Sequence, residues 1–297
     1  MSSTATPVQE AASLEAAVRP TERNRPLLRK TRKLLTSLAY VIGALALGVI
    51  VWELIIVATN AQPYILPTPL SVWNTLVDLL KTSPAASGGF WQQLWATLEG
   101  TLLGFVVGCA AGVVLGILAG EFRVVRQIIY PYLVAVQSLP KVALVPVLAT
   151  WFGFGLNAKI ALVVLLVFFP VLVNTFQGVA TADPEKIDLV RSLRGDRWQQ
   201  LWRVRFFSAM PYMFTGFELG IVYAFLGAVL AEMTGAQSGT GVMIEQFQTN
   251  ADTQATFAML IVLAVVGLLL NTIVRVVHKR VVFWEQASAG MGLAVTN

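Results

Sequence analysis

The sequence predicts an all-α, polytopic protein with six transmembrane helices, and three observations support this. Hydrophobic residues make up 56% of the 297 residues. Charged residues make up 12%, about half the share found in a soluble domain. Short charged blocks alternate with long apolar segments, as in membrane proteins and unlike a nucleic-acid-binding surface. A soluble fold could not bury this much apolar surface, so lipid must solvate part of it.

Six segments are long enough to cross a bilayer as helices, which takes about 20 residues each. They are Leu34–Thr59, Leu94–Gly120, Ile128–Phe152, Lys159–Val179, Tyr212–Met233 and Ala255–Val277. The first is too long for the apolar region of a signal peptide, so we expect it to stay in the membrane. The expected organisation is a tail at residues 1–33, a transmembrane domain at residues 34–280 and a second tail at residues 281–297.

The basic residues predict the orientation of the chain. With six spans, all of the 21 Lys and Arg residues except Lys81, Lys141 and Lys159 belong to one side of the membrane. Lys and Arg accumulate in cytoplasmic loops. Both termini are therefore expected in the cytoplasm. Five or seven spans would divide the same charges between the two sides.

Residues that could carry chemistry are few. Cys109 is the single cysteine, so a disulfide within the chain is excluded, and with one histidine no Cys/His metal cluster can form. His278 precedes two basic residues near a helix end, and we expect it at the membrane interface with its ring toward water. No Walker A sequence occurs. The chain is therefore expected to be non-catalytic and to bind no cofactor itself.

The second predicted span carries a glycine at every fourth position. These residues are Gly100, Gly104, Gly108, Gly112, Gly116 and Gly120. Such a stripe forms a groove along a helix, which lets a neighbouring helix approach closely. A phosphate-binding loop is excluded, because no Gly-Lys-Ser/Thr follows. We interpret the stripe as a packing surface.

The third predicted span is interrupted. Pro140 and Pro146 each remove a backbone donor, and Gln137, Ser138 and Lys141 lie beside the first of them. Broken helices at membrane depth persist where protein or a water-filled cavity satisfies the exposed backbone groups. One interpretation is a harmless kink in a packed helix. The cluster of three polar side chains favours the other, a lining of the substrate path.

Polar residues in the other spans give further candidates for this path. Intramembrane acids are functional candidates because charge in lipid is costly. Glu232, near the outer end of the fifth span, could be a gate or a structural anchor. Lys141 could attract an anionic substrate or neutralise Glu232, and Asn174 and Tyr223 are weaker path candidates. Glu218, in the inner half of the fifth span, is expected to pair with a basic loop residue.

Two segments outside the spans are predicted to be helical. Thr68, followed by proline, predicts the start of a short amphipathic helix on the outer membrane surface. The loop at residues 180–207 predicts two helices. Asp183 would cap the first, Gly195 would end it in a left-handed conformation, and Asp196 would cap the second. An apolar stripe on the first helix is predicted at Ile187, Val190 and Leu193. Pro211 is expected to begin the return into the membrane.

This loop could lie on anionic lipid or dock a protein partner. The stretch Asp188-Leu-Val-Arg-Ser-Leu-Arg-Gly-Asp-Arg-Trp-Gln resembles the cytoplasmic signature loop of permease subunits of ATP-binding-cassette importers, in the nitrate, sulfonate and taurine branch. Arg194 stands where that family has glycine, and Phe206-Phe207 replace its Leu-Pro. Further matches are Tyr64-Ile-Leu-Pro-Thr-Pro, Ser138-Leu-Pro-Lys-Val-Ala-Leu-Val-Pro, Trp151-Phe-Gly-Phe-Gly and Ala231-Glu-Met-Thr-Gly-Ala. The resemblance covers nearly the whole membrane part.

The resemblance implies a type I importer permease in a bacterial inner membrane. Two permease copies, expected as a homodimer, would form the path for a small anionic or aromatic organic solute, such as a sulfonate or a vitamin precursor. Two ATPase subunits would bind ATP and dock on the loops, and a periplasmic or lipid-anchored binding protein would deliver the substrate. The coupling residues transferred by motif position are Asp188, Arg191, Gly195, Asp196 and Arg197.

Two other classes of function are less consistent with the residues. An ion-coupled secondary transporter would have acids near the membrane midplane and an inverted repeat. Most acids here lie near span ends, and no clear repeat is present. An intramembrane enzyme would have more polar side chains in the spans than this chain has.

Overall fold

The computed structural model describes residues 25–84, 86, 88–122, 124–125, 127–128, 135 and 140–284. These residues form helices and connecting turns, and no β-strand occurs among them. The chain divides into two compact units, Met1–Ala61 and Gln62–Asn297. Five helices among the described residues are long and apolar enough to cross a membrane. One of them, α2 (Arg25–Thr59), belongs to the first unit and contains the apolar segment Ile42–Thr59.

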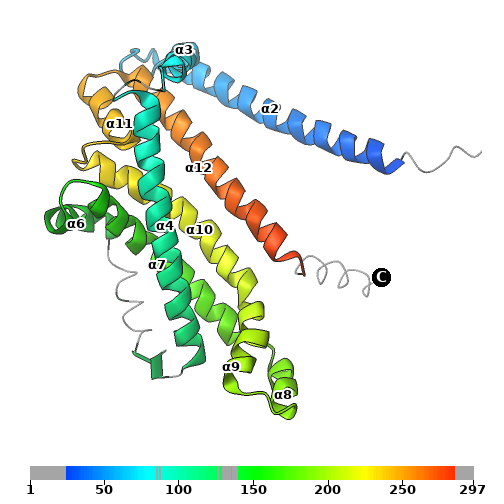
Figure 1. Ribbon diagram of the computed structural model, residues 1–297. Coiled ribbons are helices and arrows are strands. Elements are labelled where there is room, and N and C mark those ends of the chain that lie inside the picture. The colour runs from blue at the N-terminus through cyan, green and yellow to red at the C-terminus, as the bar shows by residue number, and fades with distance from the viewer. Residues whose placement is uncertain are drawn as a thin grey trace, which may run out of the picture. The chain divides into compact units, whose positions relative to one another are not determined.

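The second unit contains the other four long helices (Figure 1). They are α4 (Phe90–Glu121), α7 (Leu156–Ala180), α10 (Phe206–Met233) and α12 (Thr253–Val281). Each contains one of the predicted spans, so those four predictions are confirmed. Helix α7 packs against both α4 and α10 and forms the centre of the unit. A buried core of valines and alanines joins α7 to α10, at Val163, Val167, Val171, Ala224 and Ala228.

The glycine stripe of α4 packs directly on α7, as predicted. A Cβ atom built on Gly104 would lie 2.5 Å from the side chain of Val163. One built on Gly112 would lie 2.9 Å from the carbonyl oxygen of Phe168 and from Cβ of Val171. The other glycines of the stripe meet α7 side chains in the same way. The two backbones therefore approach as closely as they do only because these positions lack side chains.

We expect Gly112→Ala to lower the free energy of unfolding by about 1–3 kcal/mol, the usual range for overpacking. The nearest atom is a backbone oxygen, which cannot rotate away. Gly267→Ala in α12 is the matched control, because its Cβ would lie 3.4 Å from the Phe225 ring, an ordinary contact. Alanine there should stabilise the helix by about 0.5–1 kcal/mol. Thermal unfolding of the detergent-solubilised protein measures both, and equal effects would contradict the packing role of Gly112.

The predicted third span lies partly outside the described residues. Its described end consists of η2 (Lys141–Leu144), a short 3₁₀ segment, and α6 (Val145–Phe152). Pro140 is not helical, so the predicted interruption at this proline is confirmed. Pro146 stands in the first turn of α6, where its missing N–H has no helical partner to lose. Because most of the segment between α4 and η2 is not described, the prediction of six spans stays a prediction.

Two shorter helices lie at one end of the unit. Helix α3 (Pro69–Lys81) begins where predicted, and Thr68 caps it by accepting a hydrogen bond from the Ser71 backbone N–H at 3.3 Å. Helix α11 (Thr240–Thr249) was not predicted. It follows α10 after a turn of six residues and precedes α12 (Figure 1). Both helices lie at the end of the unit opposite α8 (Pro184–Ser192) and α9 (Arg197–Gln200).

Candidate functional site

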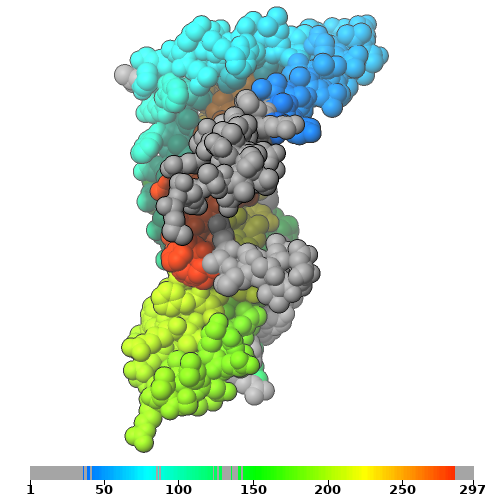
Figure 2. All heavy atoms as spheres, turned by 90° about the vertical axis from the view of Figure 1, so that its right-hand side faces the viewer, coloured from blue at the N-terminus to red at the C-terminus, as the bar shows by residue number. Residues whose placement is uncertain are grey.

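The loop between α7 and α10 forms the predicted pair of helices, α8 and α9, which we call the bracket (residues 183–205). Asp183 caps α8 by accepting a hydrogen bond from the Glu185 backbone N–H at 3.0 Å. Asp196 caps α9 by accepting one from the Gln199 backbone N–H at 2.7 Å. Figure 2 shows the bracket, in yellow-green, projecting at one end of the visible surface. Both predicted caps are therefore confirmed.

The turn between α8 and α9 differs from the prediction by one residue. The left-handed residue is Arg194, with φ of 59°, and not Gly195. The Gly195 backbone N–H donates to the Val190 carbonyl oxygen at 2.8 Å and closes the end of α8. Gly195 is needed for space instead, because a Cβ atom there would lie 2.7 Å from that same oxygen. Helix ends commonly place a left-handed residue at this point, and Arg194 occupies it.

The exposed face of α8 carries apolar side chains. Leu189 and Leu193 are 60% and 76% exposed, whereas Val190 is half-buried toward the turn. Leu193 is the C-cap residue that follows α8, and its exposure leaves the predicted stripe of Ile187, Val190 and Leu193 untested. An ion pair between Asp188 Oδ1 and Arg191 Nη1, at 3.0 Å, lies on the same helix. Exposed apolar side chains that are rimmed by charged ones occur at surfaces that dock other proteins.

The second helix of the bracket continues into the membrane helix without a break. Helix α9 passes through η3 (Leu201–Arg205), one π-helical turn, directly into α10. Pro211 lies inside α10, which begins at Phe206, so the helix starts before this proline, and the point at which it enters the membrane stays a prediction. A proline removes only one helical hydrogen bond, which neighbouring helices and side chains can compensate in a membrane protein. The bracket and α10 are therefore joined by continuous helical backbone from Arg197 onward.

A groove of about 350 Å³ lies halfway along α7 and α10. It is lined by Lys141, Leu166, Phe169, Pro170, Val173, Asn174, Leu219 and Tyr223. Three of the predicted path residues, Lys141, Asn174 and Tyr223, therefore share one surface. The Lys141 ammonium lies 5.7 Å from the centre of the Phe169 ring, within the range of a cation–π contact. Asn174 Nδ2 donates to the Pro170 carbonyl oxygen at 2.7 Å, which fixes the orientation of its amide.

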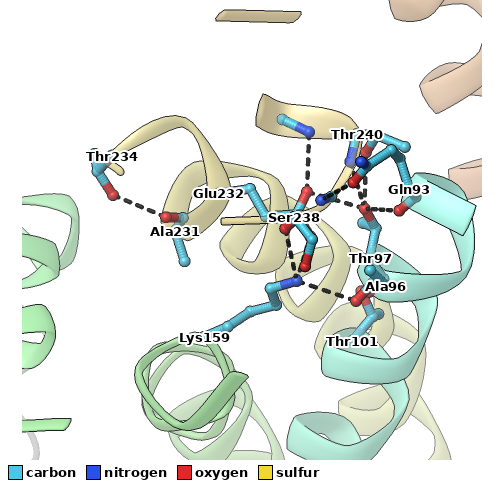
Figure 3. A network of polar contacts seen from close by, with 12 residues as sticks. Gln93, Ala96, Thr97, Thr101, Lys159, Ala231, Glu232, Thr234, Ser238 and Thr240 are labelled. Carbon is cyan, nitrogen blue, oxygen red and sulfur yellow. Dashed lines mark hydrogen bonds and ion pairs between the residues drawn. The ribbon is translucent and has the colours of Figure 1, made fainter. Parts of the chain in front are cut away.

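A buried ion pair joins four elements near α11 (Figure 3). Lys159 Nζ lies 2.6 Å from Glu232 Oε1, and the two side chains are 3% and 0% exposed. Glu232 Oε2 accepts hydrogen bonds from Thr97 Oγ1 and from the Gly241 backbone N–H, both at 2.9 Å. Lys159 also donates to the Ala96 carbonyl oxygen at 3.0 Å. The carboxylate is therefore anchored between α4, α7 and the first turn of α11.

The turn that precedes α11 packs tightly against the Glu232 carboxylate. Gly239, with φ of 130°, lies against the Glu232 carboxylate, and a Cβ atom there would collide with it. Gln93 Oε1 accepts the Gly239 backbone N–H at 2.6 Å, and Thr97 Oγ1 accepts the Thr240 N–H at 2.8 Å. A carboxylate at a helix N-terminus is also favoured by the helix dipole. This geometry favours the anchor over the gate for Glu232.

The chain matches the model of the binding-protein-dependent transport system inner membrane component family over residues 112–283. That is more than half of the chain. The chain belongs to this family. Its members are non-catalytic permease subunits of ATP-binding-cassette importers. The alternative of an ion-coupled secondary transporter is set aside by this membership. The family implies partnership with an ATPase and a substrate-binding protein.

Individual relatives agree with this membership. The permease is 32% identical over 245 residues to the transport permease protein SsuC of Bacillus subtilis, covering 82% of this chain and 87% of the relative. It is 32% identical to the riboflavin transport system permease protein RibX of Chloroflexus aurantiacus, covering 81% and 88%. It is 29% identical to the taurine transport system permease protein TauC of Escherichia coli, covering 82% and 89%.

Solved structures show the same fold. An amino acid ABC transporter crystallised with histidines matches with a TM-score of 0.55 and 15% identity, covering 69% of this permease and 98% of that chain. An inward-facing MetNI methionine ABC transporter matches with a TM-score of 0.50 and 18% identity, covering 70% and 96%. These likenesses confirm the predicted importer permease fold.

The structure corrects the predicted partner of Glu232 and adds one residue that was not predicted. Glu232 pairs with Lys159, which was not a candidate, and not with Lys141. Lys159 and Glu232 were both predicted near the outer ends of neighbouring spans. This shared depth in the membrane could have indicated from the sequence that the two side chains pair. Gln137 and Ser138 lie outside the described residues.

Glu218 and His278 form a second pair that differs from the prediction. His278 Nδ1 lies 2.7 Å from Glu218 Oε1, and the Arg275 guanidinium lies 3.6 Å from the same carboxylate. Both partners come from α12 and not from a loop. The His278 side chain is only 16% exposed and its ring stacks on Phe214 at 5.1 Å. The prediction of a water-facing histidine was therefore wrong, because this side of α12 packs on α10.

Proposed function

We propose that this permease forms the inner-membrane path for a small anionic or aromatic organic solute. The groove between η2, α7 and α10 is the observation that carries the proposal. It brings a cation, an amide and two aromatic rings together halfway along the membrane helices, at Lys141, Asn174, Phe169 and Tyr223. RibX and TauC are named for riboflavin and taurine transport, one an aromatic solute and the other a sulfonate.

The chemistry of the groove suits weak recognition of such a solute. The Lys141 ammonium attracts an anionic group, and the attraction is stronger in the groove than in bulk water because protein surrounds the pair on part of its surface. The exposed face of Tyr223 offers a flat surface to a planar solute, whereas the Phe169 ring is mostly buried and forms part of the apolar wall. Most other lining side chains are apolar, so they would form no hydrogen bonds with the solute. Affinity and strict selection would then rest with the substrate-binding protein.

Transport would be driven from the bracket. Two permease copies, expected as a homodimer with both termini in the cytoplasm, would each dock an ATPase subunit that carries the ATP. We propose that Asp188, Arg191, Gly195, Asp196 and Arg197 contribute to this docking and its transmission. Because α9 continues through η3 into α10, movement of the bracket would rotate the helix that lines the groove. The groove would thereby face the two sides of the membrane in turn.

Lys141→Gln is expected to reduce import of an anionic solute about tenfold at low concentration, the equivalent of about 1.4 kcal/mol of lost attraction. Import of a neutral analogue of the same size should change little. Uptake into proteoliposomes containing the full transporter measures both. Lys81→Gln is the control, because Lys81 is exposed and pairs with Asp78 on α3. Equal losses for the anion and the analogue would remove Lys141 as a charge-selective residue.

A further inference from the structure

A second groove, separate from the proposed substrate path, lies where α4 meets the bracket. It has a volume of about 310 Å³, and its lining is almost entirely carbon. Side chains from the last turns of α4 form one wall, and Trp198, Leu201 and Trp202 form the other. The Trp198 and Trp202 rings pack edge to face, with their centroids 5.6 Å apart, and both remain exposed. Exposed tryptophans at this depth are typical of a membrane–water interface.

This groove continues an apolar stripe along α4. Leu103, Val107, Ala110, Val114 and Leu118 recur at helical spacing, and all five are exposed. The stripe lies on the side of α4 away from the glycines that contact α7. Fifteen residues separate its first and last members, a length of about 22 Å along a helix. An extended hydrocarbon chain could follow the stripe into the groove without meeting a polar side chain.

In the described part of the chain, the charged side chains at the groove leave one positive charge without an acidic partner. Arg197 and Glu121 are its two charged lining residues. Glu121 is already paired with Arg205, whose guanidinium lies 3.1 Å from its carboxylate. The Arg197 side chain is exposed, and no acidic side chain pairs with it among the residues that the structure describes. An anionic group at the mouth of the groove would therefore meet an uncompensated guanidinium.

We propose that this groove binds one anionic phospholipid, with an acyl chain along the α4 stripe and its phosphate on Arg197. Guanidinium groups suit phosphate because several N–H donors face it in one plane. The tryptophan rings would flank the glycerol region, where amphipathic rings are favoured. The lipid would contact both α4 and the bracket, so it would hold the bracket against the membrane helices. Arg197, proposed above as a coupling residue, would then act partly through this lipid.

The test uses full-length permease in phosphatidylcholine vesicles that contain a small fraction of brominated lipid. Bromine quenches tryptophan fluorescence on contact, so quenching reports occupancy at Trp198 and Trp202. Brominated phosphatidylglycerol is expected to bind about fivefold better than brominated phosphatidylcholine, which corresponds to about 1 kcal/mol for one arginine near an anionic headgroup. The readout is lipid binding alone, so a failure of the transport proposal would not affect it.

Three variants complete the test. Arg197→Ala should abolish the preference, whereas Arg197→Lys should keep most of it. Arg191→Ala is the control, because Arg191 is exposed on the same bracket but is paired with Asp188. Its preference should match that of the original protein. The proposal is overturned if quenching does not depend on the headgroup or if the preference survives in Arg197→Ala. It is equally overturned if the preference survives in Trp198→Phe/Trp202→Phe, since another tryptophan would then be the reporter.

Discussion

Lys159→Met is expected to lower the free energy of unfolding of the permease by about 3–5 kcal/mol, the usual cost of removing one partner of a buried ion pair. The substitution leaves Glu232 fully buried without its cation. Methionine fills most of the volume of the lysine stem, so the loss would come from charge and not from a cavity. Thermal unfolding in detergent and the amount of protein in the membrane would both report the change.

A double substitution separates the ion pair from the packing. Lys159→Met combined with Glu232→Gln removes both charges, and the amide can still accept the N–H of Gly241 and the hydroxyl of Thr97. We expect this variant to recover most of the lost stability. Lys81→Met is the control, because the Lys81–Asp78 pair is exposed and should contribute about 0–1 kcal/mol. If Lys159→Met is as stable as Lys81→Met, the buried pair does not anchor these helices.

The anchor has a consequence for transport. Glu232 holds the first turn of α11 and the last turns of α10 together, and Thr97 joins both to α4. α10 would then move with α11 as one body instead of bending at the intervening turn. A rotation started at the bracket, at the other end of α10, would then also move α11. This rigidity requires the network to stay intact during transport, which is consistent with the complete burial of Glu232.

Features set by local periodicity could be predicted from the sequence. The long helices, the glycine stripe and the caps at Asp183 and Asp196 depend on spacing and on neighbours within one turn. The pairing of Lys159 with Glu232 depends on which helices pack together and at what depth. Lys141 was a natural alternative because it too lies in the membrane part. It lies beside the middle of α7 and α10, however, whereas Glu232 lies in the last turn of α10.

The turn of the bracket was predicted one residue away from its position in the structure. A glycine near a helix end suggests a left-handed residue, but sequence alone does not fix the register of the last hydrogen bonds. The structure shows Arg194 in that conformation and Gly195 in contact with Val190. The conformation explains the glycine of the family pattern, whereas nothing in the structure explains the arginine of this chain. The resembling permeases place glycine at the position of Arg194, and the left-handed conformation explains why glycine is favoured there.

Gly195→Val is expected to abolish most import, reducing it about tenfold or more, while the amount of permease in the membrane stays unchanged. The new side chain would collide with Val190 and with the carbonyl oxygen that closes α8. Such overpacking typically costs about 1–3 kcal/mol. A loss of about 1.4 kcal/mol at the docking surface is already a tenfold change in affinity for the ATPase. The bracket is exposed, so the buried core of α7 and α10 should fold normally.

Arg194→Gly is the matched control at the neighbouring residue. A side chain in the left-handed conformation costs about 1–2 kcal/mol, so glycine at this position should stabilise the turn and leave import intact. Substrate-stimulated ATP hydrolysis and uptake would be measured together in proteoliposomes containing the full transporter. Gly195→Val should lower both, because α9 continues directly into α10 and a displaced bracket would transmit the wrong movement. If import and stimulated hydrolysis both persist in Gly195→Val, the closed turn at Val190 is not required for coupling.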